Sequence, residues 1–110
     1  MAKTIEFDYN DTHYTLEFTR RTVKQMEKQG FVFSSIEEMP YSGIENLYRG
    51  SFLAHHPRIT DETVNAIWKY LPNKDKFIGA LGELYNEPFA SLMDDENIEE
   101  SKKLNWEQKG

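Results

Sequence analysis

The sequence predicts an α+β domain in which an N-terminal β-hairpin packs on a bundle of about four helices, with a disordered acidic tail at the C-terminus. Apolar and polar residues alternate at the start of the chain, and apolar residues at helical spacing follow. The last stretch is highly charged. A length of 110 residues suits one domain. We therefore expect a single domain over residues 1–93 and a flexible tail over residues 94–110.

Residues 3–18 predict the hairpin. Two runs of apolar side chains occupy alternate positions, first Ile5, Phe7 and Tyr9, and then Tyr14, Leu16 and Phe18. The residues between the runs include Asn10 and Asp11, which tolerate the positive φ of a tight turn. An isolated hairpin is unstable in water, so we expect helices to cover its apolar face.

The first helix is predicted over residues 20–29. Thr19 can cap its N-terminus, because a threonine hydroxyl accepts a hydrogen bond from an unpaired amide of the first turn. Gly30 can end the helix, because glycine readily adopts the left-handed conformation found after a helix C-terminus. Residues 34–40 are predicted to be a connector without regular structure.

The second helix is predicted over residues 42–56. Ser42 and Glu45 are three residues apart, which is the spacing of a capping box. Pro57 ends this helix, because the residue before a proline is pushed away from α geometry.

Two further helices are predicted over residues 61–71 and 74–93. Thr60 can cap the first of them, and Trp68 lies at the centre of its apolar stripe, so we expect this indole to be buried. Pro88 lies inside the last helix and removes one backbone hydrogen bond, which predicts a kink or a short break.

Composition excludes several classes of function. The formal charge is −6 with only short basic runs, so we expect no nucleic acid partner. The chain has no cysteine, which rules out disulfides and thiol catalysis and is typical of a reducing compartment. No apolar run approaches the roughly 20 residues of a membrane span, and the N-terminus has no apolar signal segment, so we expect no membrane partner.

The adjacent histidines His55 and His56 are the first candidates for a metal or catalytic site. Neighbouring side chains on a helix point about 100° apart, so the two cannot easily face one ion, and His13 lies far away in the hairpin. Histidines near a helix C-terminus interact favourably with its carbonyl groups. We therefore favour a structural role, with no metal and no cofactor, and keep a metal-binding domain as a less favoured alternative.

Other candidates for catalysis or phosphate binding are weaker still. Ser51 has glycine on one side only and does not form a G-x-S-x-G motif. Gly79 and Gly82 lack the preceding strand and the following Lys-Ser/Thr of a phosphate loop, so we expect them to let two helices approach closely. The sequence therefore predicts that the protein is not an enzyme.

The tail holds a possible binding motif. Leu104 and Trp106 lie in the charged segment "LNWEQ", and a lone aromatic residue in such a segment is a typical anchor for a partner. The alternative is that the indole folds back on the domain or is inert. If the partner site lies on the helical body instead, Tyr48, Phe52 and Tyr85 are the candidates.

The order of three motifs resembles a family of small siphophage and prophage proteins that are similar to tail assembly chaperones. The motifs are "YTLEFTRRTVKQMEKQGF", "LYRGSFLAHHP" and "ELYNEPFASLMDD". The resemblance covers residues 5–95 and implies no catalytic residues. It implies a protein of the bacterial host cytoplasm that binds the tape measure protein and the major tail protein, and that could form a homo-oligomer. A structural subunit of the tail or connector, retained in the virion, is the alternative.

Overall fold

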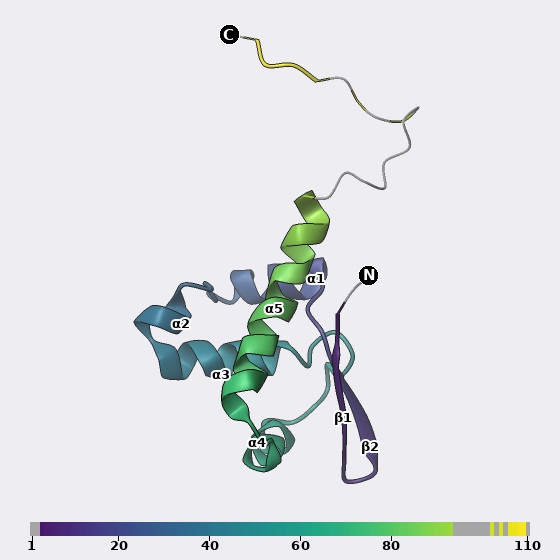
Figure 1. Ribbon diagram of the computed structural model, residues 1–110, viewed down its shortest axis with the longest axis vertical. Helices are drawn as coiled ribbons and strands as arrows, with labels where there is room; N and C mark the ends of the chain where they lie inside the picture. The colour runs from purple at the N-terminus through teal and green to yellow at the C-terminus, as the bar shows by residue number, and fades with distance from the viewer. Residues whose placement is uncertain (1–2, 94–101, 103, 105, 110) are drawn as a thin grey trace.

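The computed structural model describes residues 3–93, 102, 104 and 106–109, and it confirms the predicted α+β fold. Within these residues, a two-stranded antiparallel sheet is followed by five helices. The hairpin lies at one side of the helices, and the last helix runs the length of the body (Figure 1). The flexible tail predicted over residues 94–110 lies largely outside the described residues.

The hairpin consists of β1 (Ile5–Tyr9) and β2 (Thr12–Leu16). The two strands are joined by Asn10 and Asp11, whose φ angles are 48° and 63°. Two successive positive φ angles are typical of the turn that matches the twist of a two-residue hairpin. The predicted hairpin is thus confirmed, with Asn10 and Asp11 at its turn.

Helix α1 (Arg20–Lys28) has the ends that the sequence predicts. The Thr19 hydroxyl accepts from the Thr22 amide at 3.1 Å, and the Thr22 hydroxyl accepts from the Thr19 amide at 2.9 Å. This reciprocal pair is a capping box that satisfies two backbone donors. Gly30 follows the helix with a φ of 95°, in the region that favours glycine.

The segment between the first two predicted helices differs from the expectation. Residues 34–40 include a short helix, α2 (Ser35–Glu38), and the beginning of α3 (Pro40–Gly50). Helix α3 therefore starts before Ser42, so the predicted capping box is wrong. Proline is favoured in the first turn because it has no amide hydrogen to leave unpaired and its φ is already helical.

Close approach between helices occurs at a glycine that the sequence did not single out. A Cβ on Gly43 of α3 would lie 2.7 Å from Cα of Ile36 in α2. Gly79 has no such neighbour within 4 Å, and for Gly82 only the Phe33 ring tip lies at 4.0 Å. The prediction that Gly79 and Gly82 permit helix packing is therefore wrong, and Gly43 has that role.

Helix α3 also ends earlier than the predicted 42–56, because the chain turns toward the sheet after Gly50. The Glu17 amide donates to the Ser51 carbonyl at 3.0 Å, and the Ser51 hydroxyl donates to the Tyr48 carbonyl at 2.6 Å. The Ser51 carbonyl is thus hydrogen-bonded to the residue after β2, and the segment that follows Ser51 lies along that strand.

Helices α4 (Asp61–Tyr70) and α5 (Lys74–Met93) complete the fold. The Thr60 hydroxyl accepts from the Thr63 amide at 3.2 Å, which confirms the predicted cap. Helix α5 continues through Pro88, so the break that the sequence allowed at this position does not occur. The Pro88 side chain is buried.

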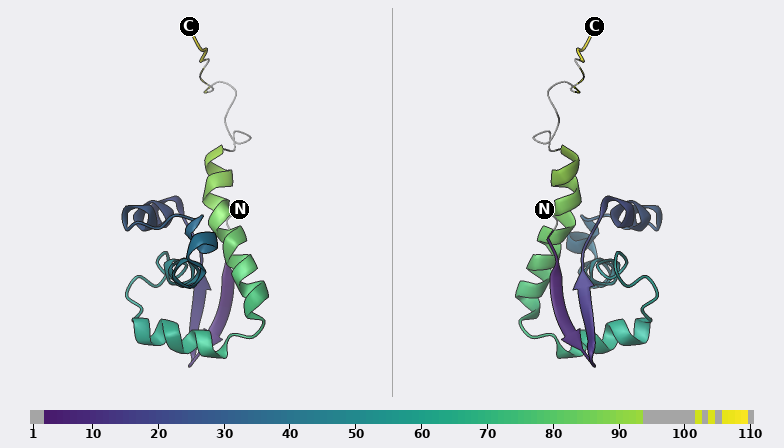
Figure 2. Two further views of the ribbon diagram at one scale, coloured as in Figure 1. Left: turned by 90° about the vertical axis from the view of Figure 1, so that its left-hand side faces the viewer. Right: turned by 90° about the vertical axis from the view of Figure 1, so that its right-hand side faces the viewer.

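The core lies between the hairpin and the helices, and aromatic side chains dominate it. Both strands and all five helices contribute side chains to it or pack against it. Figure 2 shows from two sides how the helices lie around the hairpin. The fully buried side chains are large apolar ones with two small polar exceptions: Leu16, Thr22, Leu47, Ser51, Phe52, Ile67 and Leu81. Among the described residues, no helix combines the length and apolar character needed to cross a membrane.

Candidate functional site

A large apolar groove lies between α3, α4 and the start of α5. Its volume is about 560 Å³. Apolar and aromatic side chains form most of its surface, and polar residues border it. The lining residues are Pro40, Tyr41, Ile44, Glu45, Tyr48, Asn65, Trp68, Lys69 and Ile78.

Trp68 forms one wall of the groove. Its ring packs on Tyr48, with ring centroids 4.9 Å apart, and on Phe77 at 6.1 Å. The indole is only half-buried, because the positions of α4 that face the core belong to Val64 and Ile67. The prediction that Trp68 is buried was therefore wrong, and its other side is available to a ligand.

Tyr48 lies beneath the groove and is held in place. Its hydroxyl donates to the Val64 carbonyl at 2.7 Å, and the side chain is 4% exposed. Burial raises the pKa of the Tyr48 phenol far above its usual value, with the nearby Arg49 charge opposing this only in part. The phenol therefore stays protonated at all physiological pH values and joins α3 to α4.

The border of the groove combines one exposed aromatic ring with charges. Tyr41 is 82% exposed, so its ring is accessible at the edge of the groove. Glu45 and Lys69 provide one charge of each sign. The Lys74 ammonium lies 5.5 Å from the centre of the Trp68 ring and donates to the backbone, which steadies the indole.

The partner-binding residues predicted from the sequence fall into three places. Phe52 is 0% and Tyr85 is 3% exposed, so both belong to the core and cannot contact a partner of the folded domain. Tyr48 contributes only to the lining of the groove. Leu104 and Trp106 are 88% and 84% exposed. An apolar stripe marks the buried face of a helix, which explains why the first two were misplaced.

The adjacent histidines connect the turn after α3 to strand β2. The Thr15 amide donates to Nε2 of His56 at 3.0 Å, and Nε2 of His55 donates to the Glu17 carboxylate at 2.6 Å. The His56 ring also packs on Tyr14, with centroids 4.9 Å apart. The structural role predicted for both residues therefore has a specific form. They fasten the chain to the hairpin, rather than capping a helix.

Burial and nearby positive charges change the acidity of His56. Desolvation lowers the pKa of this imidazole below its ordinary value of 6.5, and His55 and His13 lower it further. A neutral ring is what the observed bond requires, because Nε2 must carry a lone pair to accept from the Thr15 amide.

His13 lies apart from the pair, on the solvent side of the hairpin. Its Nε2 lies 2.9 Å from Glu6 Oε1 and its Nδ1 lies 2.7 Å from Asp8 Oδ1. Hydrogen bonds to these carboxylates raise the pKa of His13. Over the part of the chain that the structure describes, no group of three or more His, Asp or Glu side chains is arranged to hold a metal ion.

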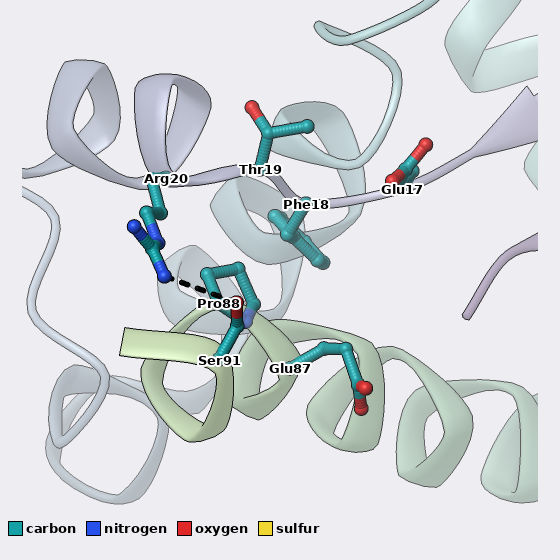
Figure 3. Close-up of a pocket in the computed structure, with 7 residues that line it drawn as sticks. All are labelled: Glu17, Phe18, Thr19, Arg20, Glu87, Pro88 and Ser91. Atoms are coloured by element: carbon teal, nitrogen blue, oxygen red, sulfur yellow. Dashed lines mark hydrogen bonds between the residues drawn. The ribbon is translucent and has the colours of Figure 1, made fainter. Parts of the chain in front are cut away.

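A smaller cleft of about 170 Å³ lies between the start of α1 and the second half of α5 (Figure 3). Arg20 donates to the Ser91 hydroxyl at 3.0 Å across it, while the Glu17 and Glu87 carboxylates point away from this bond. Its lining contains neither histidine nor cysteine. The cleft therefore contributes to the contact between α1 and α5 and lacks the residue pairs of nucleophilic catalysis.

Comparison with known proteins places the chain in one family. A family model described as "Domain of unknown function (DUF5055)" matches residues 1–109. The chain belongs to the DUF5055 family. No curated protein and no solved structure matches it. The family description does not specify an activity or partner, so the groove is the main guide to what this DUF5055 domain binds.

Sequence reasoning missed most residues of the groove. Tyr41, Ile44 and Ile78 were not singled out, since the groove forms only when three helices meet. One available signal was Tyr41, an aromatic residue at the start of α3 that lies outside the helix's buried stripe.

Proposed function

We propose that this protein is a non-enzymatic assembly chaperone for phage tails, which binds the tape measure protein or the major tail protein in the bacterial host cytoplasm. The observation that carries the proposal is the apolar groove with Tyr41 and Trp68 at its surface. The resemblance to small siphophage and prophage proteins supplies the class of partner. The arrangement of His55 and His56 supports the proposal, because both serve the fold.

The groove suits an amphipathic helix of the partner. Helices from three directions form its sides, and apolar anchors at helical spacing can enter a groove of this kind. Aromatic rings such as Trp68 and Tyr41 provide large contact areas at a low cost in conformational entropy. The charges of Glu45 and Lys69 at the border can set the orientation of the bound segment.

Variants of the groove test this assignment. Tyr41→Asp places a charge at a side chain that is 82% exposed, so it should leave folding intact and weaken capture of the partner about tenfold. Leu92→Asp is the matched control, because Leu92 is 62% exposed on α5 outside the groove. Capture is measured by co-purification with tape measure protein or major tail protein. Failure of the unmodified protein to capture either partner, with all proteins folded, refutes the proposal.

The tail provides a second comparison. Trp106→Ala should weaken capture if the tail anchors the partner, and it should have no effect if the groove alone does. Mass spectrometry of mature virions separates a chaperone from a structural subunit. A chaperone is absent from the finished particle, whereas stoichiometric presence favours the structural alternative.

A further inference from the structure

The two edges of the hairpin differ in how their backbone groups are paired. Along β2, the Thr15 amide donates to His56 and the Glu17 amide donates to the Ser51 carbonyl, so the segment after α3 covers this edge. Antiparallel pairs alternate between residues that bond each other and residues whose backbone groups point outward. The backbone amide and carbonyl of Thr15 point away from β1. The backbone groups of Glu6, which lies opposite Thr15, therefore point away from β2, and so do those of Asp8 two residues later.

The outer edge of β1 is therefore open. Among the residues that the structure describes, the backbone amides and carbonyls of Glu6 and Asp8 have no hydrogen-bond partner. The bonds between the two strands are made by the residues on either side of them. The hairpin stands at the side of the helices (Figure 1). An exposed edge with unpaired amides and carbonyls is a template for an added strand.

The side chains of β1 define what such a strand must carry. Glu6 and Asp8 are exposed on one face, and both carboxylates contact the single His13 ring. Because one imidazole carries at most one positive charge, the two carboxylates leave a net negative charge on this face. Ile5, Phe7 and Tyr9 lie on the other face and are only half-buried, so the helices do not cover them fully. A strand with apolar side chains on that face would complete the cover. Basic side chains at its alternate positions would lie opposite the two carboxylates.

We propose that the open edge of β1 binds an extended segment of a partner protein in which basic and apolar residues alternate. A second copy of this chain does not fit. Pairing two β1 strands with their apolar faces on the same side places Glu6 and Asp8 opposite acidic or neutral residues of the other copy. Like charges directly opposite one another destabilise a sheet. The edge is separate from the groove, so the inference is independent of the proposed function.

Amide hydrogen exchange followed by NMR tests the inference on the full chain. The probe is the peptide acetyl-Thr-Lys-Val-Arg-Ile-Lys-Thr-amide, which alternates basic and apolar residues. In the protein alone, the Glu6 and Asp8 amides should exchange rapidly. Millimolar peptide should slow both by about tenfold or more, because they then donate to the added strand.

Two control peptides identify the interaction. A peptide with Glu in place of Lys and Arg should not slow exchange, and the basic peptide N-methylated at its Lys and Arg residues should also fail. The double variant Glu6→Lys/Asp8→Lys provides the reverse test. It should lose the response to the basic peptide and gain one to the acidic peptide, and a circular dichroism spectrum like that of the unmodified protein should show that it is folded.

Several results overturn the inference. No slowing at millimolar basic peptide means that the edge does not accept a strand. Equal slowing by the acidic or the N-methylated peptide means that the contact is not a charge-selected strand pairing. Slowing of the Glu6 and Asp8 amides with protein concentration alone, together with a dimer in sedimentation, makes a second copy the occupant.

Discussion

His56 holds the turn after α3 against β2. Its removal should therefore cost more stability than the loss of a histidine that only lies near a helix C-terminus. In His56→Ala, the Thr15 amide loses its acceptor at 3.0 Å, and the ring contact with Tyr14 is lost as well. An unpaired backbone donor costs about 1–3 kcal/mol when buried. Because Thr15 is only half-buried and water can reach its amide, we expect about 1–2 kcal/mol in total.

The same bond predicts how stability depends on pH. The pKa of His56 is lowered in the folded protein, so the unfolded chain binds a proton near pH 6.5 while the folded protein does so only at lower pH. Between these two values the unfolded state holds more protons, and stability falls as the pH falls. His13 has the opposite sign, because its raised pKa adds stability below pH 6.5 that is lost as pH rises through the folded value.

Urea melts of three proteins separate these effects. His56→Gln retains an oxygen that can accept from the Thr15 amide but does not titrate. It should lose less stability than His56→Ala near neutral pH. Below pH 6.5, the unmodified protein should lose stability relative to His56→Gln. A cost of His56→Ala below about 0.5 kcal/mol would refute the bond as a source of stability. A stability difference between the unmodified protein and His56→Gln that is the same at all pH values would refute it as well.

Three further predictions follow from packing and capping. Phe52→Ala should cost about 3–5 kcal/mol in urea melts, because its ring is 0% exposed and packs among other aromatic rings; a cost near 1 kcal/mol would place it outside the core. Gly43→Ala should lower the Tm because its Cβ would meet the Ile36 backbone. Gly79→Ala in an open helical position should raise stability by about 0.5–1 kcal/mol, and similar effects of the two would contradict the packing argument. Thr19→Ala should cost about 1 kcal/mol through loss of the capping box, and an unchanged melt would show that this cap contributes nothing.

Local chemistry made some elements predictable. Alternation of apolar residues and the turn pair Asn10–Asp11 identified the hairpin, and the threonines before α1 and α4 marked their caps. Such signals depend on neighbours in the sequence, so they can be read without a structure. The helix predicted over 42–56 failed for the opposite reason. Its end is decided by a hydrogen bond from Glu17, which is far away in sequence.

The sequence by itself determined that this protein is a small α+β domain with a hairpin, capped helices and an aromatic core. Only the tertiary structure decided which aromatic residues are available to a partner. Periodicity shows that Trp68 and Phe52 lie on apolar faces, but the packing of neighbouring helices buries Phe52 and leaves one side of Trp68 in the groove. The same holds for the sheet edges. The segment that pairs with the β2 side follows α3, and the bonded residues Thr15 and His56 are 41 residues apart in sequence.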